Sequence, residues 1–197
     1  MSATGRSDVR NPDDFYETPA WCVHRFLEAA RLPGGLWVEP SAGHGATIRA
    51  VNSVRTDVKW AGFEIRQEAY PHLEPLVTNH GSVTMDFLKT TFIDTPAVIL
   101  GNPPYSLAME FVTHALYSGA HVALLLRLNF VGSAKRSKFF RECMPDVYVL
   151  PNRPSFTGGG TDATEYAWCH WLPEHPRRQG IIEVLAETTA QERKRAA

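Results

Sequence analysis

The chain has 197 residues, of which 44% are hydrophobic and 21% are charged, and its formal net charge is -1 with the histidines neutral. This length suits one well-buried domain of ordinary globular composition. No apolar stretch approaches the roughly 20 residues that cross a bilayer, and the N-terminus lacks the apolar core of a secretion signal, so no membrane partner is expected. The balanced charge gives no global support to a nucleic-acid partner, so local basic clusters would have to supply that binding.

The three cysteines, Cys22, Cys143 and Cys169, are odd in number and far apart in the sequence. This pattern argues against a disulfide framework and a zinc cluster, and it favours a reducing compartment. We therefore predict a cytoplasmic protein with no metal site.

The sequence predicts a boundary at residue 14, between a polar N-terminus and an ordered domain. Residues 1–13 are polar and are expected to be flexible. Apolar residues at near-helical spacing follow Thr18 and Pro19, which suit the N-cap and the first position of a helix. The sequence therefore predicts that ordered structure begins with a helix at this point.

Helices and strands then alternate along nearly the whole chain. Further helices are expected at 46–54, 107–119 and 133–143, with a short helix or an irregular link at 66–75. Strands are expected at 36–40, 59–65, 96–102, 121–130, 146–151 and 165–173, with a third short strand or its exit loop at 81–88. Residues 181–197 are expected to form a last helix, which frays into a charged tail at 186–197. The alternation predicts a single α/β domain over residues 14–185, built on a doubly wound, mostly parallel sheet.

Polar or glycine-rich stretches follow several of the expected strands. Three of them are residues 39–45, Glu64 and residues 102–105. Ligands of an open parallel sheet bind beyond the carboxyl ends of its strands, so we expect these stretches to form one site.

The first stretch, VEPSAGHGAT, joins a strand to a helix through a glycine turn. Gly43 and Gly45 allow the backbone to turn tightly and to approach a ligand, and the helix N-terminus behind them favours an anion or an acceptor. Ile48 stands where a dinucleotide fingerprint would have its third glycine, and no lysine follows as in a phosphate-binding loop. A plain tight turn would explain the glycines equally well.

Two further acids follow the next expected strands. Glu64 ends the second strand, where a carboxylate can accept hydrogen bonds from both ribose hydroxyls of a nucleoside. Asp86 follows the third and is placed to accept from an exocyclic amine. Taken alone, Glu64 is more readily explained as a solvated strand-end carboxylate, and Asp86 could instead sit at a turn. Together with Glu39 and the glycine turn, they predict a pocket that binds a nucleoside and has no phosphate-binding loop.

The stretch VILGNPPY, residues 98–105, ends a buried strand with a stiff polar segment. Asn102 offers an amide oxygen, and Pro103 and Pro104 have no backbone N–H and little conformational freedom. Tyr105 supplies a flat face that can stack on another ring. This set suits a planar amine held between two acceptors beneath an aromatic ring, although a proline turn with a packed tyrosine would also explain it.

Basic residues gather in the stretch AKRSKFFRE, where Lys135 and Arg136 are candidate contacts to a nucleic-acid backbone. Arg153 is a further candidate for a phosphate contact. A solvated helix face and a solvated loop are the alternatives for these side chains.

The motifs VEPSAGHG, Glu64, MDF and NPPY, in this order, resemble the amino-group S-adenosylmethionine-dependent methyltransferases with an NPPY motif, above all the DNA adenine-N6 methyltransferases. DFYETPAWCVHRF resembles the segment that precedes the glycine motif in this family, and NRPSFTGGG resembles the loop whose aromatic residue packs against the extruded base. The resemblance implies a Rossmann-like class I methyltransferase fold with a C-terminal antiparallel strand.

The resemblance also implies S-adenosylmethionine as the cofactor and assigns roles to individual residues. The implied cofactor contacts are Tyr16, Thr18, Pro19, Glu39, Ser41, Gly43, Gly45, Glu64, Ile65, Asp86, Phe87 and Asn102. The implied catalytic residues are Asn102, Pro103, Pro104 and Tyr105, and the implied base contacts are Tyr105 and Phe156. The target base would be flipped out of the duplex into this pocket.

We therefore predict transfer of a methyl group to N6 of adenine in DNA, by a compact enzyme of the kind carried by phages or mobile elements. Little of the chain after NPPY is left for a recognition module. Recognition of a short sequence, weak specificity, a single-stranded or RNA substrate, and a partner subunit for sequence recognition are therefore the alternatives. The rival functions are methylation of RNA adenine or protein glutamine, and a catalytically silent nucleic-acid-binding subunit of an active partner.

Overall fold

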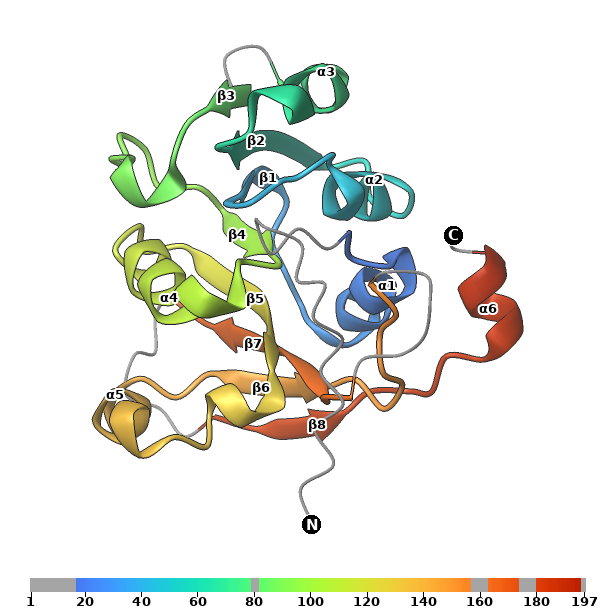
Figure 1. Ribbon diagram of the computed structural model, residues 1–197, viewed down its shortest axis with the longest axis vertical. Helices are drawn as coiled ribbons and strands as arrows, with labels where there is room; N and C mark the ends of the chain where they lie inside the picture. Colours follow the sequence, from blue (N-terminus) through green and yellow to red (C-terminus); the bar gives the residue numbers. More distant parts are fainter. Residues whose placement is uncertain (1–16, 79–81, 157–162, 174–179, 196–197) are drawn as a thin grey trace.

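Eight strands of the described chain form one sheet, in the order β3-β2-β1-β4-β5-β7-β6-β8 (Figure 1). The computed structural model describes residues 17–78, 82–156, 163–173 and 180–195. Tyr16 and the N-terminal stretch 1–13, expected to be flexible, lie outside the described residues. The strands are β1 Gly35–Glu39, β2 Val58–Glu64, β3 Ser82–Thr84, β4 Val98–Gly101, β5 His121–Arg127, β6 Asp146–Val149, β7 Tyr166–Trp171 and β8 Ile182–Val184.

The sheet is doubly wound and mostly parallel, as the sequence predicts. The five strands from β1 to β5 pair in parallel with one another. β7 lies between β5 and β6 and runs antiparallel to both, and β8 pairs in parallel with β6. The expected antiparallel strand near the C-terminus is therefore confirmed.

Helices cover both faces of the sheet, with α1, α2 and α3 on one face and α4 and α5 on the other (Figure 1). The α-helices are α1 Ala20–Ala29, α2 Ala46–Asn52, α3 Tyr70–Leu73, α4 Ala108–Leu116, α5 Ser137–Glu142 and α6 Ala190–Arg195. Short 3-10 turns are η1 Gln67–Ala69, η2 Glu74–Leu76, η3 Phe87–Lys89, η4 Tyr105–Leu107, η5 Leu128–Phe130 and η6 Ala134–Arg136. Within the described ranges, no helix is both long and apolar enough to span a bilayer.

Each central strand supplies two cores, because neighbouring residues of a strand point to opposite faces of the sheet. Trp37 and Leu100 pack in the core on the α1 and α2 side, whereas Val38 and Ile99 pack in the core on the α4 side. All four side chains are buried. Burial on both faces explains why these strands read as nearly continuous apolar runs.

Two expected helix positions differ from the structure. The first helix begins at Ala20, so Pro19 takes the N-cap position, and its carbonyl accepts a hydrogen bond from the Cys22 N–H at 2.9 Å. The helix expected from residue 181 is wrong at its start, because Ile182–Val184 form β8 beside β6. Pairing with a distant strand overrides the local pattern there.

The C-terminal segment returns to α1. The guanidinium of Arg25 donates to the Thr188 hydroxyl at 3.0 Å and to the Glu192 carboxylate at 2.8 Å. Glu192 lies on α6, so the charged tail expected at 186–197 holds a short helix that α1 contacts.

The end of β4 packs closely against the residue that follows β1. A Cβ added at Gly101 would lie 2.8 Å from Cδ of Pro40, so only glycine fits there without a shift of the neighbouring chain. The residue that follows, Asn102, accepts a hydrogen bond from the Ser41 hydroxyl at its main-chain carbonyl, at 3.1 Å. The two loops therefore leave the sheet side by side.

Candidate active site

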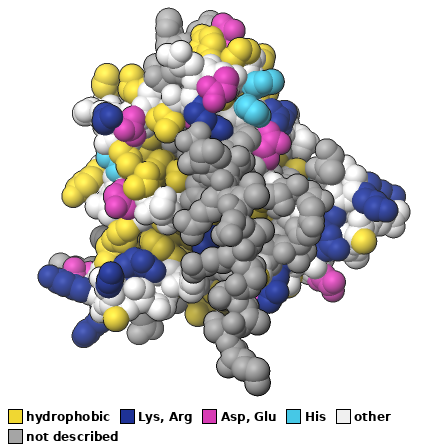
Figure 2. All heavy atoms as spheres, in the orientation of Figure 1, with side chains coloured by type: hydrophobic (Ala, Val, Ile, Leu, Met, Phe, Trp, Pro, Cys, Tyr) yellow, Lys and Arg dark blue, Asp and Glu magenta, His cyan; other side chains and the backbone are white. Residues whose placement is uncertain are grey.

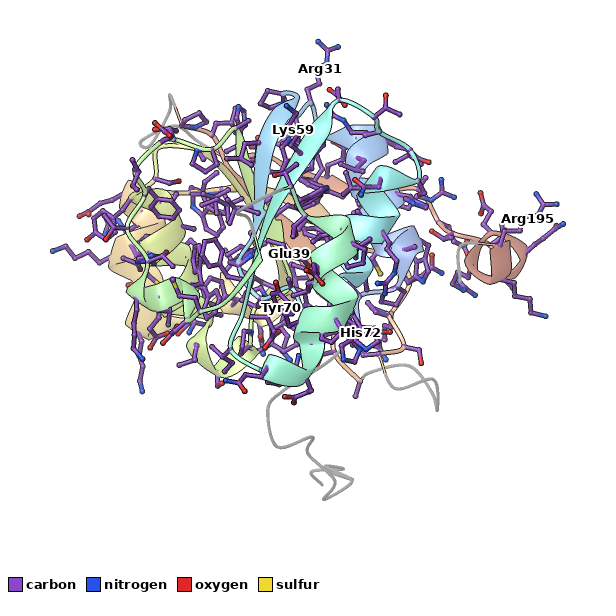
Figure 3. The ribbon with its side chains drawn as sticks, turned by 90° about the horizontal axis from the view of Figure 1, so that it is seen from above. Arg31, Glu39, Lys59, Tyr70, His72 and Arg195 are labelled. Carbon is purple, nitrogen blue, oxygen red and sulfur yellow. The ribbon has the colours of Figure 1, made fainter. Side chains whose placement is uncertain are left out.

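A cavity opens at the carboxyl ends of β1, β2 and β4. Most of the residues that the sequence assigns to cofactor binding line it: Thr18, Glu39, Ser41, Gly43, Glu64, Ile65, Asp86, Phe87 and Asn102. Pro19 and Gly45 are not among its lining residues. Figure 3 shows Glu39 in the interior of the protein, whereas Lys59, near the start of β2, lies towards the other ends of the strands.

The glycine turn between β1 and α2 has a backbone that other residues rarely adopt. Gly43 and Gly45 have φ angles of 53° and 82°, in the left-handed region. A Cβ at Gly45 would also lie 2.4 Å from Cδ1 of Leu76. The turn directs the N–H of Gly43 to the carboxylate of Glu64, at 2.8 Å, and so connects the ends of β1 and β2.

Glu39 is buried at the end of β1 and lines the cavity. Its Oε2 has no hydrogen-bond partner among the described residues. Burial raises the pKa of Glu39 to about 8, against the opposing effect of hydrogen bonds from Thr47 and Ile48. A buried acceptor without a donor is unfavourable, so this carboxylate suits a ligand that brings a donor or a positive charge.

Glu64, at the end of β2, differs from Glu39 because both of its carboxylate oxygens accept hydrogen bonds. Oε1 accepts from the Arg66 main-chain N–H at 3.0 Å and from Nε at 2.9 Å, and Oε2 accepts from Arg66 Nη2 at 3.1 Å in addition to Gly43. Burial alone would raise the pKa of Glu64, but the hydrogen bonds from Arg66 and Gly43 lower it below its ordinary value. Glu64 is therefore ionised and fully bonded.

Asp86 and Phe87 lie at the start of η3, after the short strand β3. Asp86 caps this turn, because Oδ1 accepts from the Leu88 N–H at 3.0 Å, and Oδ2 lies 3.2 Å from the Lys89 ammonium. Phe87 is buried and stacks on Phe111 with ring centroids 5.5 Å apart. Both residues still line the cavity, which gives that part of the wall one carboxylate and one aromatic ring.

The NPPY segment presents one acceptor that is not used within the described chain. The main-chain carbonyl of Asn102 is bonded to Ser41, whereas its side-chain Oδ1 is buried without a hydrogen-bond partner among the described residues. Pro103 is buried, and Pro104 lines the cavity. The acceptor that Asn102 has left for a ligand is therefore its side-chain oxygen, because its main-chain carbonyl already accepts from Ser41.

Aromatic rings surround the far side of this segment. Tyr105 and Phe156 each contact Tyr166, at centroid distances of 5.5 Å and 5.2 Å. The guanidinium carbon of Arg127 lies 5.0 Å from the centre of the Tyr105 ring. Burial and the neighbouring Tyr166 raise the pKa of Tyr105 above its ordinary value, so its hydroxyl is neutral. The expected base-stacking pair, Tyr105 and Phe156, thus lies against a third ring.

The basic candidates have different surroundings. Arg136 donates to the Phe130 carbonyl at 2.8 Å and lies 4.4 Å from that ring, and Arg153 is paired with Glu165. Lys135 is exposed. Figure 2 shows Lys and Arg side chains gathered over α5 and over α6. Arg136 and Arg153 therefore take part in local contacts of the fold.

Three residues of the site, Arg66, Arg127 and Tyr166, are not among those predicted from the sequence. Arg127 ends β5, and Arg66 comes two residues after β2, so the strand-end rule that identified Glu64 also applies to them. Tyr166 is the first residue of β7 and pairs with Arg127 across the sheet. It reaches this edge because β7 is antiparallel; the sequence predicted a strand at 165–173 but assigned no role to Tyr166.

Comparisons with known proteins identify the fold. No protein-family model and no curated protein matches the sequence. Among solved structures, a predicted O-methyltransferase from Agrobacterium tumefaciens has a TM-score of 0.61 at 16% identity, over 91% of this chain and 98% of the other. A modification subunit assigned to a type I restriction enzyme from Vibrio vulnificus YJ016 has a TM-score of 0.56 at 14% identity, over 87% and 46%. A dimethyladenosine transferase from Plasmodium falciparum has a TM-score of 0.55 at 13% identity, over 81% and 63%.

The chain spans less than two thirds of the length of the last two structures. At these identities the likeness concerns the fold. The described chain has the α/β, Rossmann-like fold of class I methyltransferases, with its candidate site at the edge of the sheet where ligands of such folds bind.

Proposed function

We propose that this chain, built on the class I methyltransferase fold, transfers a methyl group from S-adenosylmethionine to the N6 amino group of adenine in DNA. The observation that carries the proposal is the buried Oδ1 of Asn102, an acceptor without a donor in the described chain, on the rigid NPPY segment beside the cavity. A planar amine supplies the donor that this oxygen lacks.

The residues of the cavity fit the cofactor. Oε2 of Glu39 is a buried acceptor that lacks a donor, and the ammonium of the methionine moiety would supply one. Glu64 would hold the ribose, and Asp86 and Phe87 would lie beside the adenine ring. Ile65 adds an exposed apolar side chain to the same wall. When bound, S-adenosylmethionine supplies a methyl group on a sulfonium, an electrophile that needs no further activation.

The chain's own contribution at the reacting centre is orientation. Asn102 Oδ1 and the Pro103 carbonyl would accept the two hydrogens of the target amine, which turns the nitrogen lone pair away from conjugation and towards the methyl group. The prolines restrict the backbone, so these acceptors lose little freedom when the amine binds. Tyr105, neutral because of its raised pKa, would stack on the base.

A nucleic-acid substrate is favoured by the surroundings of the NPPY segment. Three aromatic rings and the Arg127 guanidinium meet there, and aromatic stacking stabilises a flipped base by about 1 to 3 kcal/mol. The likeness to the restriction-enzyme modification subunit supports DNA, and also a partner subunit that reads the sequence. RNA adenine is the second candidate, supported by the likeness to the dimethyladenosine transferase.

The test is a parallel assay with labelled S-adenosylmethionine and four substrates: unmethylated duplex DNA, single-stranded DNA, RNA and a protein extract. Each product is digested and its modified unit is identified by mass. N6-methyladenine in DNA is the expected product. Label only in RNA or in protein would keep the amine-orienting site and reject the substrate. Absence of label in all four, with the cofactor bound, would favour a silent subunit or a missing partner.

A further inference from the structure

Glu64 has no acceptor capacity left in the described structure. An ionised carboxylate offers about four lone-pair sites. Four donors reach this one: the N–H of Gly43 at 2.8 Å, and the main-chain N, Nε and Nη2 of Arg66 at 3.0, 2.9 and 3.1 Å. Each carboxylate oxygen receives two of them. A ribose hydroxyl could therefore donate to Glu64 only if one of these donors left.

The four donors differ in how readily they can leave. Two are main-chain N–H groups, one in the glycine turn and one at the exit of β2, and moving them would disrupt the backbone that forms the site. The other two belong to the guanidinium of Arg66, at the end of a flexible side chain. Arg66 also lines the cavity. The guanidinium donors can therefore leave Glu64 without a change of fold, whereas the two main-chain donors cannot.

We propose that the Arg66 guanidinium occupies the ribose positions on Glu64 in the empty protein, and that cofactor binding exchanges its two hydrogen bonds for those of the two ribose hydroxyls. This inference rests on the proposed function, because it takes the ligand to be a ribonucleoside. No covalent bond changes in the exchange. Arg66 therefore sets the affinity for the cofactor through competition, and it contributes no attraction to the bound ligand.

The electrostatics of the cavity favour the contact between Arg66 and Glu64 in the empty protein. Glu39 and Glu64 lie in one cavity wall, and the charge of Glu64 is among the causes that raise the pKa of Glu39. The side chains of Arg66 and Glu64 are only 16% and 7% exposed, so an unpaired Glu64 would be a poorly solvated charge. Arg66 neutralises that charge until a ligand with its own donors replaces it.

The test compares cofactor affinity in three proteins by calorimetry, with S-adenosylhomocysteine as the probe. Arg66→Met keeps the length of the side chain and removes its donors, and we expect it to bind the probe on the order of tenfold tighter than the unmodified protein. Arg66→Lys keeps the charge and loses the two-point contact, so its affinity should fall between the two. Arg55→Gln removes another guanidinium–carboxylate pair, with Asp57, together with contacts to the Leu32 carbonyl and the Trp37 ring. Because Arg55 does not line the cavity, this control should bind the probe as the unmodified protein does.

A second probe separates competition from a general loosening of the site. The 2′,3′-dideoxy analogue of S-adenosylhomocysteine cannot donate to Glu64, so Arg66→Met should leave its affinity unchanged. Equal or weaker binding of the parent probe by Arg66→Met would overturn the inference, and so would equal tightening of both probes. If the unmodified protein binds neither S-adenosylmethionine nor S-adenosylhomocysteine, the proposed function itself fails. Should Arg66→Met not fold, the ordering of Arg66→Lys against the unmodified protein decides the question.

Discussion

At the ends of β1 and β2 the candidate site consists of carboxylates in contact with the main chain and with Arg66, whereas past the end of β4 it consists of prolines and aromatic rings. Gly43, Glu64 and Arg66 form a closed set of hydrogen bonds on the first side. On the second side, Oδ1 of Asn102 is buried without a hydrogen-bond partner within the described chain, and the rings pack on Tyr166.

The difference shows how each side would recognise its ligand. Directional hydrogen bonds select a ligand by its donors, and changing one of them changes affinity. Aromatic packing accepts any flat ring, and one unpaired acceptor then decides whether that ring carries an amine in the right place. We therefore expect substitutions on the first side to change cofactor binding, and substitutions on the second to change turnover or substrate binding.

The largest effect is expected on the second side, at Asn102. Asn102→Ala removes the orienting acceptor, and kcat should fall by about 100- to 1000-fold, as when an oriented polar group is removed from other active sites. The dissociation constant of the cofactor should stay within twofold, because the alanine leaves the carboxylates unchanged. Single-turnover assays and calorimetry measure the two quantities. Asn129→Ala, at an exposed position, is the control; near-normal turnover by Asn102→Ala would contradict the amine-orienting role.

On the first side, the state of Glu39 predicts a pH dependence of cofactor binding. Its pKa is raised from 4.5 to about 8, so the empty protein holds this carboxyl protonated at neutral pH. Binding of an ammonium requires the ionised form, and affinity should therefore rise by about tenfold per pH unit from pH 6 and level off near pH 8. Calorimetry in buffers of different ionisation enthalpy should detect release of one proton at pH 7.

Glu39→Gln is the matched variant for this prediction. It should abolish the pH slope and weaken cofactor binding by about 10- to 100-fold, the usual range for a hydrogen bond to a charged group. The empty variant should also lose the part of the pH dependence of its stability that Glu39 causes. A raised folded pKa means that the unmodified protein loses stability as the pH rises from 4.5 to about 8. A pH-independent affinity in the unmodified protein would remove Glu39 from the ammonium site.

A smaller effect is expected at Arg127, which lies over Tyr105. Arg127→Gln removes the positive charge beside the aromatic rings and the cation–π contact with the Tyr105 ring. We expect KM for the nucleic acid to rise by about tenfold, equivalent to about 1.4 kcal/mol, with cofactor affinity unchanged. Arg153→Gln is the comparison, because Arg153 already pairs with Glu165 and its loss should change KM less. A reversed order of the two variants would contradict this assignment.

The smallest effects separate two neighbours in the basic stretch. Lys135 is exposed, and Lys135→Gln should reduce the slope of log affinity against log salt by about one without changing stability. Arg136 is bonded to the Phe130 carbonyl, so Arg136→Gln should lower the free energy of unfolding by about 1 kcal/mol. Salt titrations of binding and denaturant unfolding measure these changes. An unchanged slope with Lys135→Gln would make this residue plain surface.

Much of the site could be predicted because its residues stand within a few positions of a strand end. Glu39, Glu64 and Asn102 each follow or end an apolar run, and parallel strands bring their carboxyl ends to one edge of the sheet. The turn at Gly45 could be predicted for a local reason too, because glycine readily adopts the left-handed backbone that the structure shows there. Local order and a known sheet geometry were enough for these positions.

Tertiary structure alone decided how those residues are bonded and charged. The saturation of Glu64 depends on a glycine from another loop, and the raised pKa of Glu39 depends on burial beneath several elements. Tyr166 reaches the site because β7 is antiparallel, and residues 182–184 form a strand because β6 offers its edge. Burial, hydrogen-bond partners and strand pairing are properties of neighbours in space, and residues distant in the chain supply them.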